Sequence, residues 1–74
     1  DELLALENKY RTQTGISNLK VKSNNLAGFF IEVSNSHLGK VPKSFQRKQT
    51  LTNGERYATD ELAKLEVEIT SAQE

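Results

Sequence analysis

The spacing of apolar residues changes twice along this chain, and that change restricts the possible folds more than any other feature. Near each end the spacing is helical, with apolar side chains at Leu3, Leu6 and Tyr10 and again at Leu62, Leu65 and Ile69. In the middle the spacing becomes two, which places Phe29, Ile31 and Val33 on one face of a strand. The pattern predicts a helix, a group of strands and a second helix.

Turn and capping residues place the boundaries of these elements. Gly15 can end a first helix of residues 1–14, and Thr59 can cap a second helix of residues 60–74. Four strands are expected at about 19–23, 28–34, 45–51 and 55–58, with tight turns at 24–27 and 52–54 and a loop at 35–43. We predict a single α+β domain over residues 1–74, in which an antiparallel four-stranded sheet (19–58) is flanked by two terminal helices paired antiparallel as a stalk.

The length and composition exclude several classes of protein. A chain of 74 residues buries only about 60% of the surface that its unfolded form exposes, so the core must be small. There is no cysteine, which removes disulfides and thiolate metal sites. No apolar run approaches the roughly 18 residues of a membrane span, so we expect no membrane partner. Because the chain lacks an initial Met, we expect it to start inside a longer protein.

Charge is distributed unevenly along the chain although the net charge is +0. Residues 19–58 carry seven basic and two acidic side chains, a net charge of +5, whereas residues 59–74 carry one basic and five acidic side chains, a net charge of −4. Such asymmetry favours an anionic partner for the middle of the chain. A solvated surface that happens to segregate its charges is the alternative interpretation.

The sequence offers no catalytic or metal-binding motif. His37 is the only histidine, and no nucleophile turn, phosphate-binding loop or zinc-binding helix motif accompanies it. We therefore predict that this chain is not an enzyme and holds no metal or cofactor itself.

The two expected turns are the best candidates for a binding role. Asn side chains and free backbone N–H groups are good donors to phosphate oxygens, although the same residues also satisfy turn geometry alone. The candidates are the turn residues Asn24, Asn25, Thr52 and Asn53 and the nearby bases Lys22, Lys48 and Arg56. For the aromatic residues Phe29, Phe30 and Tyr57 we predict packing rather than base stacking.

Two longer motifs are more specific than turn chemistry. The first is Thr14-Gly15-Ile16, Leu19-Lys20-Val21, Asn24 and Gly28-Phe29-Phe30-Ile31-Glu32-Val33, and the second is Val41-Pro42, Arg47-Lys48-Gln49-Thr50-Leu51, Asn53, Glu55-Arg56-Tyr57, Thr59 and Glu61-Leu62. Together they resemble the clamp region of the MutS family of DNA mismatch repair proteins. The chain departs from the family pattern at Lys22 and Ser23, where a glycine and an aromatic residue are usual, and at Gly54, where alanine is usual.

The resemblance implies a function that the residues alone do not. A family member is expected to be a bacterial, cytoplasmic and nucleoid-associated homodimer that binds ATP and Mg, encircles DNA, kinks it at a mismatch and recruits repair factors. Within it, residues 1–14 and 60–74 would be the ends of lever helices, and this chain would hold the sugar–phosphate backbone of double-stranded DNA without reading its sequence. The chain taken alone could remain monomeric.

The expected strand pairing predicts which residues face DNA. We predict that antiparallel pairing brings both hairpin tips to one end of the sheet, opposite the acidic helices, where Asn24, Asn25, Thr52 and Asn53 would face DNA. The alternative is a protein–protein interaction module that uses the helical stalk. Salt-sensitive binding to any duplex would favour the first function, and salt-insensitive binding to a protein the second.

Overall fold

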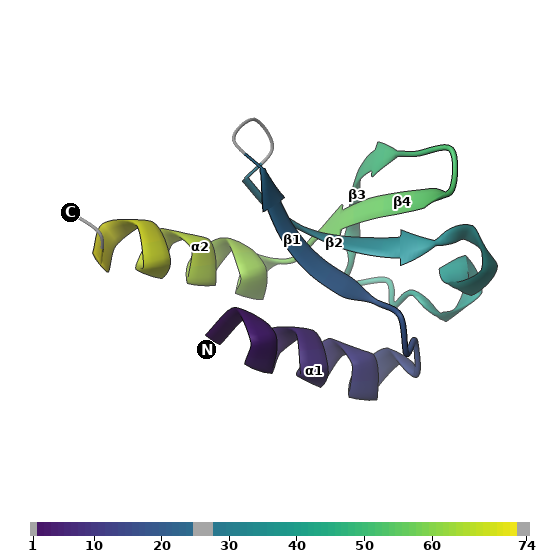
Figure 1. The fold of residues 1–74 in the computed structure, drawn as a ribbon, viewed down its shortest axis with the longest axis horizontal. Helices are drawn as coiled ribbons and strands as arrows, with labels where there is room; N and C mark the ends of the chain where they lie inside the picture. The colour runs from purple at the N-terminus through teal and green to yellow at the C-terminus, as the bar shows by residue number, and fades with distance from the viewer. Residues whose placement is uncertain (1, 25–27, 73–74) are drawn as a thin grey trace.

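A computed structural model describes residues 2–24 and 28–72 of the chain (Figure 1). Its elements follow in the order α1 (Glu2–Thr14), β1 (Lys20–Asn24), β2 (Gly28–Ser34), the 3-10 helix η1 (Asn35–Lys40), β3 (Gln46–Thr50), β4 (Gly54–Ala58) and α2 (Asp60–Ala72). The predicted order of helix, four strands and helix is confirmed. The segment expected as a plain loop after β2 instead begins with the short helix η1.

The four strands form one sheet in the order β1-β2-β4-β3, and every neighbouring pair is antiparallel. The predicted α+β class with an antiparallel four-stranded sheet is therefore confirmed. In the hairpin formed by β3 and β4, the strand that pairs with β2 is β4 and not β3. Edge strand β3 is exposed at every residue, and its register slips between Arg47 and Gln49, which leaves Lys48 as an extra residue in a β-bulge.

The strand order overturns the predicted position of the two hairpin tips. Asn24 pairs with Gly28 at one end of β2, whereas Gly54 pairs with Ser34 at the other end. A simple meander, with β3 beside β2, would have brought both turns to one end. Because β4 takes that place, the turns lie at opposite ends of the sheet, and the Asn24 end is the one beside α2.

The core lies between one face of the sheet and the helices. It contains Leu6 and Tyr10 from α1, Leu62 from α2, Ile31 and Val33 from β2, Tyr57 from β4, and the connecting residues Ile16, Leu19 and Phe45. The predicted inward face of β2 is confirmed, since Ile31 and Val33 are both 0% exposed. Aromatic edges meet at its centre, where the rings of Tyr10 and Phe45 are 5.1 Å apart in a T-shaped arrangement.

The two terminal helices lie side by side and run in opposite directions (Figure 1). Lys9 near the end of α1 meets Glu61 at the start of α2, with 2.6 Å between Lys9 Nζ and Glu61 Oε2. A groove between the helices is lined by residues such as Leu6 and Leu65. The helices thus pair antiparallel, and they enclose an open apolar groove rather than a closely packed seam.

Candidate nucleic-acid interface

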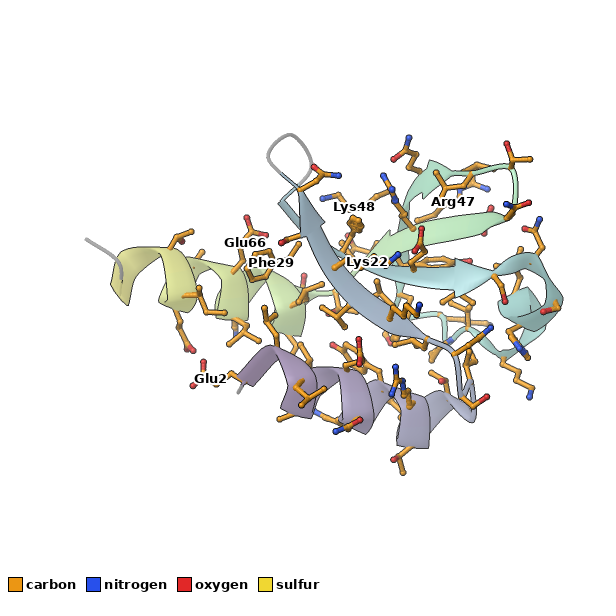
Figure 2. The ribbon with its side chains drawn as sticks, in the orientation of Figure 1. Glu2, Lys22, Phe29, Arg47, Lys48 and Glu66 are labelled. Carbon is orange, nitrogen blue, oxygen red and sulfur yellow. The ribbon has the colours of Figure 1, made fainter. Side chains whose placement is uncertain are left out.

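One face of the sheet points away from the core and collects basic side chains. Lys20 pairs with Glu32 on β2, Glu32 pairs with Arg56 on β4, and Lys22 pairs with Phe30. Directly paired residues share a face of the sheet. We call the surface formed by Lys20, Lys22, Phe30, Glu32 and Arg56 the outer face. Figure 2 shows the same segregation more broadly, with Lys22, Arg47 and Lys48 toward the sheet end and Glu2 and Glu66 toward the helical end.

A single carboxylate on the outer face compensates two of the bases predicted to contact phosphate. Glu32 Oε2 lies 2.7 Å from Lys22 Nζ, and Glu32 Oε1 lies 3.9 Å from Arg56 Nε. Arg56 also donates from Nη1 to Gln49 Oε1 at 2.8 Å. Arg56 Nε itself is buried without a hydrogen-bond partner, so the contact with Gln49 holds Arg56, while the contact with Glu32 pairs the more exposed Lys22.

Phe30 is buried although it lies on the outer face. The Arg56 guanidinium stacks over its ring, with 4.3 Å between Arg56 Cζ and the ring centroid, and only 2% of Phe30 is exposed. A ring covered in this way is unavailable to stack on a base. Tyr57 is likewise buried, and Phe29 packs against the core cluster. The prediction that these three aromatic residues serve packing is confirmed.

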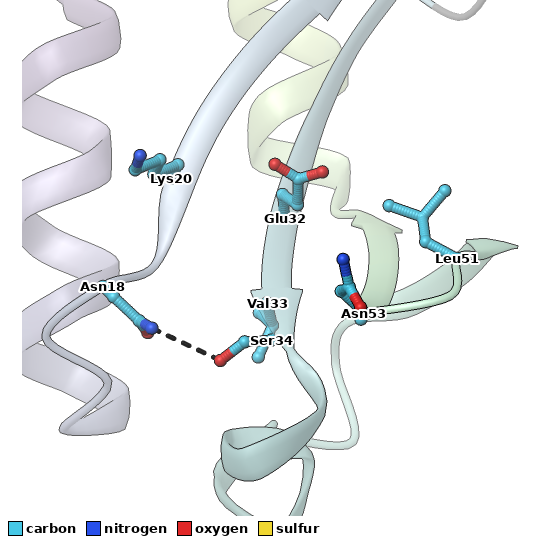
Figure 3. A pocket seen from close by; sticks show the side chains of 8 residues that line it. Asn18, Lys20, Glu32, Val33, Ser34, Leu51 and Asn53 are labelled. Atoms are coloured by element: carbon cyan, nitrogen blue, oxygen red, sulfur yellow. Dashed lines mark hydrogen bonds between the residues drawn. The ribbon is translucent and has the colours of Figure 1, made fainter.

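A hollow of about 350 Å³ opens where the outer face meets the turn between β3 and β4 (Figure 3). Lys20 and Glu32 contribute to its wall from the outer face, and Asn53 contributes from the turn. Asn18 donates to Ser34 Oγ at 3.3 Å along its lower side. The hollow therefore combines one ammonium group and several amide and hydroxyl groups with one carboxylate.

The predicted turn residues do not form one cluster. Asn24 ends β1 on the helical side of the sheet, and Asn25 lies outside the described residues. Thr52 and Asn53 belong to the opposite end, where Asn35 fixes their turn: its side chain donates to the Thr52 carbonyl at 3.1 Å, and its backbone N–H donates to the Asn53 carbonyl at 2.9 Å. The sheet thus carries two separated groups of candidates with the basic outer face between them.

Tyr10, on α1, joins the two helices at the base of the sheet. Its hydroxyl lies 2.7 Å from Thr59 Oγ1 and donates to Glu61 Oε1 at 3.0 Å. Thr59 also accepts from the Leu62 backbone N–H at 3.0 Å, which confirms it as the cap of α2. Burial raises the pKa of Tyr10, and the hydrogen bond from Lys9 lowers the pKa of Glu61.

A second tyrosine–carboxylate pair stiffens the hairpin of β3 and β4. Tyr57 donates to Glu55 Oε2 at 2.6 Å, and Arg47 Nη1 lies 3.5 Å from Glu55 Oε1. Burial and this hydrogen bond raise the pKa of Tyr57 to about 12, while the same hydrogen bond lowers the pKa of Glu55. Arg47 is therefore matched to an acid on its own hairpin.

Within residues 2–24 and 28–72, no group of three or more His, Asp or Glu side chains could hold a metal ion. No helix there is both long enough and apolar enough to cross a membrane.

Known proteins with similar sequences identify the family. A family model described as MutS family domain IV matches residues 1–74. The chain belongs to the MutS family. It is 51% identical over 70 residues to the DNA mismatch repair protein MutS of Sorangium cellulosum (strain So ce56), an alignment that covers 95% of this chain and 8% of that protein.

Two further MutS relatives agree. The DNA mismatch repair protein MutS of Lachnoclostridium phytofermentans is 51% identical over 72 residues, 97% of this chain and 8% of its own length. That of Christiangramia forsetii is 55% identical over 62 residues, 84% of this chain and 7% of its own length. The resemblance seen in the two motifs is confirmed: this chain is a MutS clamp domain, and it spans under a tenth of the curated relatives that it matches.

The sequence did not reveal which acids of this MutS domain join its helices to its sheet. In the structure Glu7 Oε2 accepts from the Val21 backbone N–H at 2.8 Å, and Glu66 Oε1 accepts from the Phe29 backbone N–H at 3.0 Å. No sequence pattern could have found these contacts, because each joins a helix to a strand that is distant in the chain.

Proposed function

We propose that this chain holds duplex DNA by its sugar–phosphate backbone and does not read base sequence. The observation that carries the proposal is the outer face, where Lys20, Lys22 and Arg56 gather around one carboxylate on the side of the sheet opposite the core. Ammonium, guanidinium and amide donors suit phosphate oxygens, and such contacts position DNA without specifying its sequence.

The dimensions of the sheet suit such a contact. From Gly28 to Ser34, β2 is about 20 Å long at roughly 3.3 Å per residue. Successive phosphates of one DNA strand rise about 3.4 Å along the helix axis while the strand winds around that axis, so this face could meet a few of them. We propose a contact surface that extends from Asn24 through Lys22 and Arg56 to Thr52 and Asn53, with Lys48 beside it. Asn25 stays a candidate from the sequence alone.

Binding by this chain alone should be weak and salt-dependent. Few phosphates can be neutralised when Glu32 already compensates two of the bases, so we expect a dissociation constant of about 10⁻⁴ M or weaker at physiological salt. Titration of matched and mismatched duplexes at several salt concentrations tests the proposal. Equal affinities that fall with salt support it, whereas a clear preference for the mismatch contradicts it.

The remaining activities belong to the whole protein and rest on the family resemblance. We propose a cytoplasmic bacterial homodimer that encircles DNA and uses ATP and Mg. The resemblance implies that the nucleotide-binding site lies in other domains of the full-length protein. We propose no catalytic step within this chain.

The groove between the helices supports a second candidate function. Leu6 and Leu65 line it, and Leu4 and Val67 are more than half exposed on the same two helices. A protein partner that packs on the stalk would cover this apolar surface. Binding to such a partner would be insensitive to salt, which distinguishes it from binding to DNA.

A further inference from the structure

The position of Glu32 has a consequence for how strongly the outer face can bind DNA. Its carboxylate touches Lys22 through one oxygen and faces Arg56 through the other, at 2.7 and 3.9 Å. It also lies in the wall of the hollow that Lys20 and Asn53 share. A phosphate group that approaches Lys22 from solvent would therefore meet a carboxylate that is already paired with this ammonium group.

A carboxylate and a phosphate compete for the same donors. Both present oxygen acceptors to ammonium and guanidinium groups, and both form charge-assisted hydrogen bonds with them. The Glu32 side chain is 26% exposed, and that of Lys22 is 47% exposed, so this pair is accessible from solvent. Exchange of the carboxylate for a phosphate at Lys22 requires rotation of the Lys22 and Glu32 side chains, whereas Arg56 Nε is buried and out of reach of a phosphate.

We propose that Glu32 acts as an internal competitor for phosphate, which weakens DNA binding by the outer face and keeps Lys22 and Arg56 in place between encounters. This inference rests on the proposed function and adds to it a residue that limits affinity. In the bound state Lys22 turns from Glu32 to the DNA backbone, while Arg56 stays over the Phe30 ring with its Nε buried. Such a clamp binds DNA with low affinity for any single phosphate.

The substitution Glu32→Gln tests the proposal, because it keeps the size of the side chain and removes its charge. Glu68→Gln is the matched control: Glu68 is exposed on α2, and its substitution changes the net charge by the same amount. Binding of the whole chain to a fluorescent duplex without mismatches is measured at several low salt concentrations. Circular dichroism confirms that each variant is folded.

We expect Glu32→Gln to bind roughly three- to tenfold more tightly than the original chain, and Glu68→Gln to bind less than twofold more tightly. The salt slope should increase in magnitude by about 1 to 2 for Glu32→Gln, since each newly available cation releases about one counterion. Adding Lys22→Ala to Glu32→Gln should remove at least half of this increase, whereas adding Lys64→Ala, which changes the net charge equally but on α2, should remove much less.

The possible outcomes separate this inference from the proposed function. If the original chain binds duplex with a salt slope but Glu32→Gln behaves like Glu68→Gln, the role of Glu32 is overturned and the clamp function stands. If Glu32→Gln weakens binding, Glu32 orients the site rather than competing for it, and the inference is also overturned. If neither the original chain nor Glu32→Gln binds duplex at low salt, both proposals fail.

Discussion

Glu66 on α2 accepts a hydrogen bond from the Phe29 backbone N–H, with 3.0 Å between the two atoms (Figure 2). Strand β4 pairs with β2 only from Ile31 onward. At Phe29, where β4 no longer lies beside β2, the Glu66 carboxylate is the hydrogen-bond acceptor instead of a neighbouring strand. Gly28 allows this contact. Its φ is +73°, and a Cβ at this position would lie 2.7 Å from Glu66 Oε2. The joint between helix and sheet therefore depends on a glycine and an acid that are distant in the chain.

Gly28→Ala should destabilise the fold by about 1 to 3 kcal/mol. Alanine is strained at a positive φ, and its methyl group would push the Glu66 carboxylate away from the Phe29 N–H. Urea denaturation measures the change. Gly39→Ala is the control, because a Cβ there meets no described atom within 4 Å. Equal stability of the two variants would show that the joint contributes nothing.

Tyr10→Phe should lower the free energy of unfolding by about 1 kcal/mol. The hydroxyl contacts Thr59, which is buried, and its loss leaves the polar group of Thr59 with fewer partners. Thr59→Ala should lower it by about 1 kcal/mol as well, through the lost cap of α2. In a double-mutant cycle the two effects should be less than additive, because both changes remove the same hydrogen bond. Full additivity would mean that Tyr10 does not act through Thr59.

Alkaline pH should destabilise the protein through Tyr57. The pKa of Tyr57 is raised from its ordinary value of 10.0 to about 12, first by burial and then by its hydrogen bond to Glu55. The neutral Tyr57 side chain therefore makes its full contribution to the free energy of unfolding below pH 10. This contribution, on the order of 2 kcal/mol, is lost as the pH rises toward 12.

Urea denaturation between pH 8 and 12 tests this prediction with Tyr57→Phe as the comparison. The variant should lose less stability over this range, and Tyr10, whose pKa is also raised, should account for part of the remaining loss. A parallel decline in both proteins would exclude Tyr57 as the cause.

Much of the fold could be predicted from the sequence because it follows from local patterns. Alternation along residues 28–34 defined the two faces of β2, and Thr59 marked the start of α2. The predicted position of the two hairpin tips was wrong, because it depends on the strand order and hence on tertiary packing. A signal for it was nevertheless present: β3 has the sequence Gln-Arg-Lys-Gln-Thr, with no apolar side chain, and such a strand belongs at an edge. Tyr57 gives β4 the apolar contact that a central strand requires.

The candidate site was predictable by residue type but not by arrangement. Charge counting found the basic middle segment, yet it could not show that Glu32 lies between Lys22 and Arg56. That relation depends on the register of three strands, two of which are joined through η1 and β3. The register of paired strands is set by which face of the sheet is buried, so it could not be predicted from the sequence before the structure was known.

The separation of the two turns allows a test of which end of the sheet holds DNA. Asn53→Ala removes amide donors beside the hollow without changing charge, so it should lower affinity and leave the salt slope nearly unchanged. Lys48→Ala removes a charge at the bulge of β3 and should reduce the magnitude of the slope by about 1. Asn24→Ala changes the opposite end, beside α2.

Salt titrations of the three variants in the full-length protein separate these effects. A loss for Asn24→Ala alone would place the contact at the helical end, and unchanged binding by all three would move it to the segment of residues 35–43.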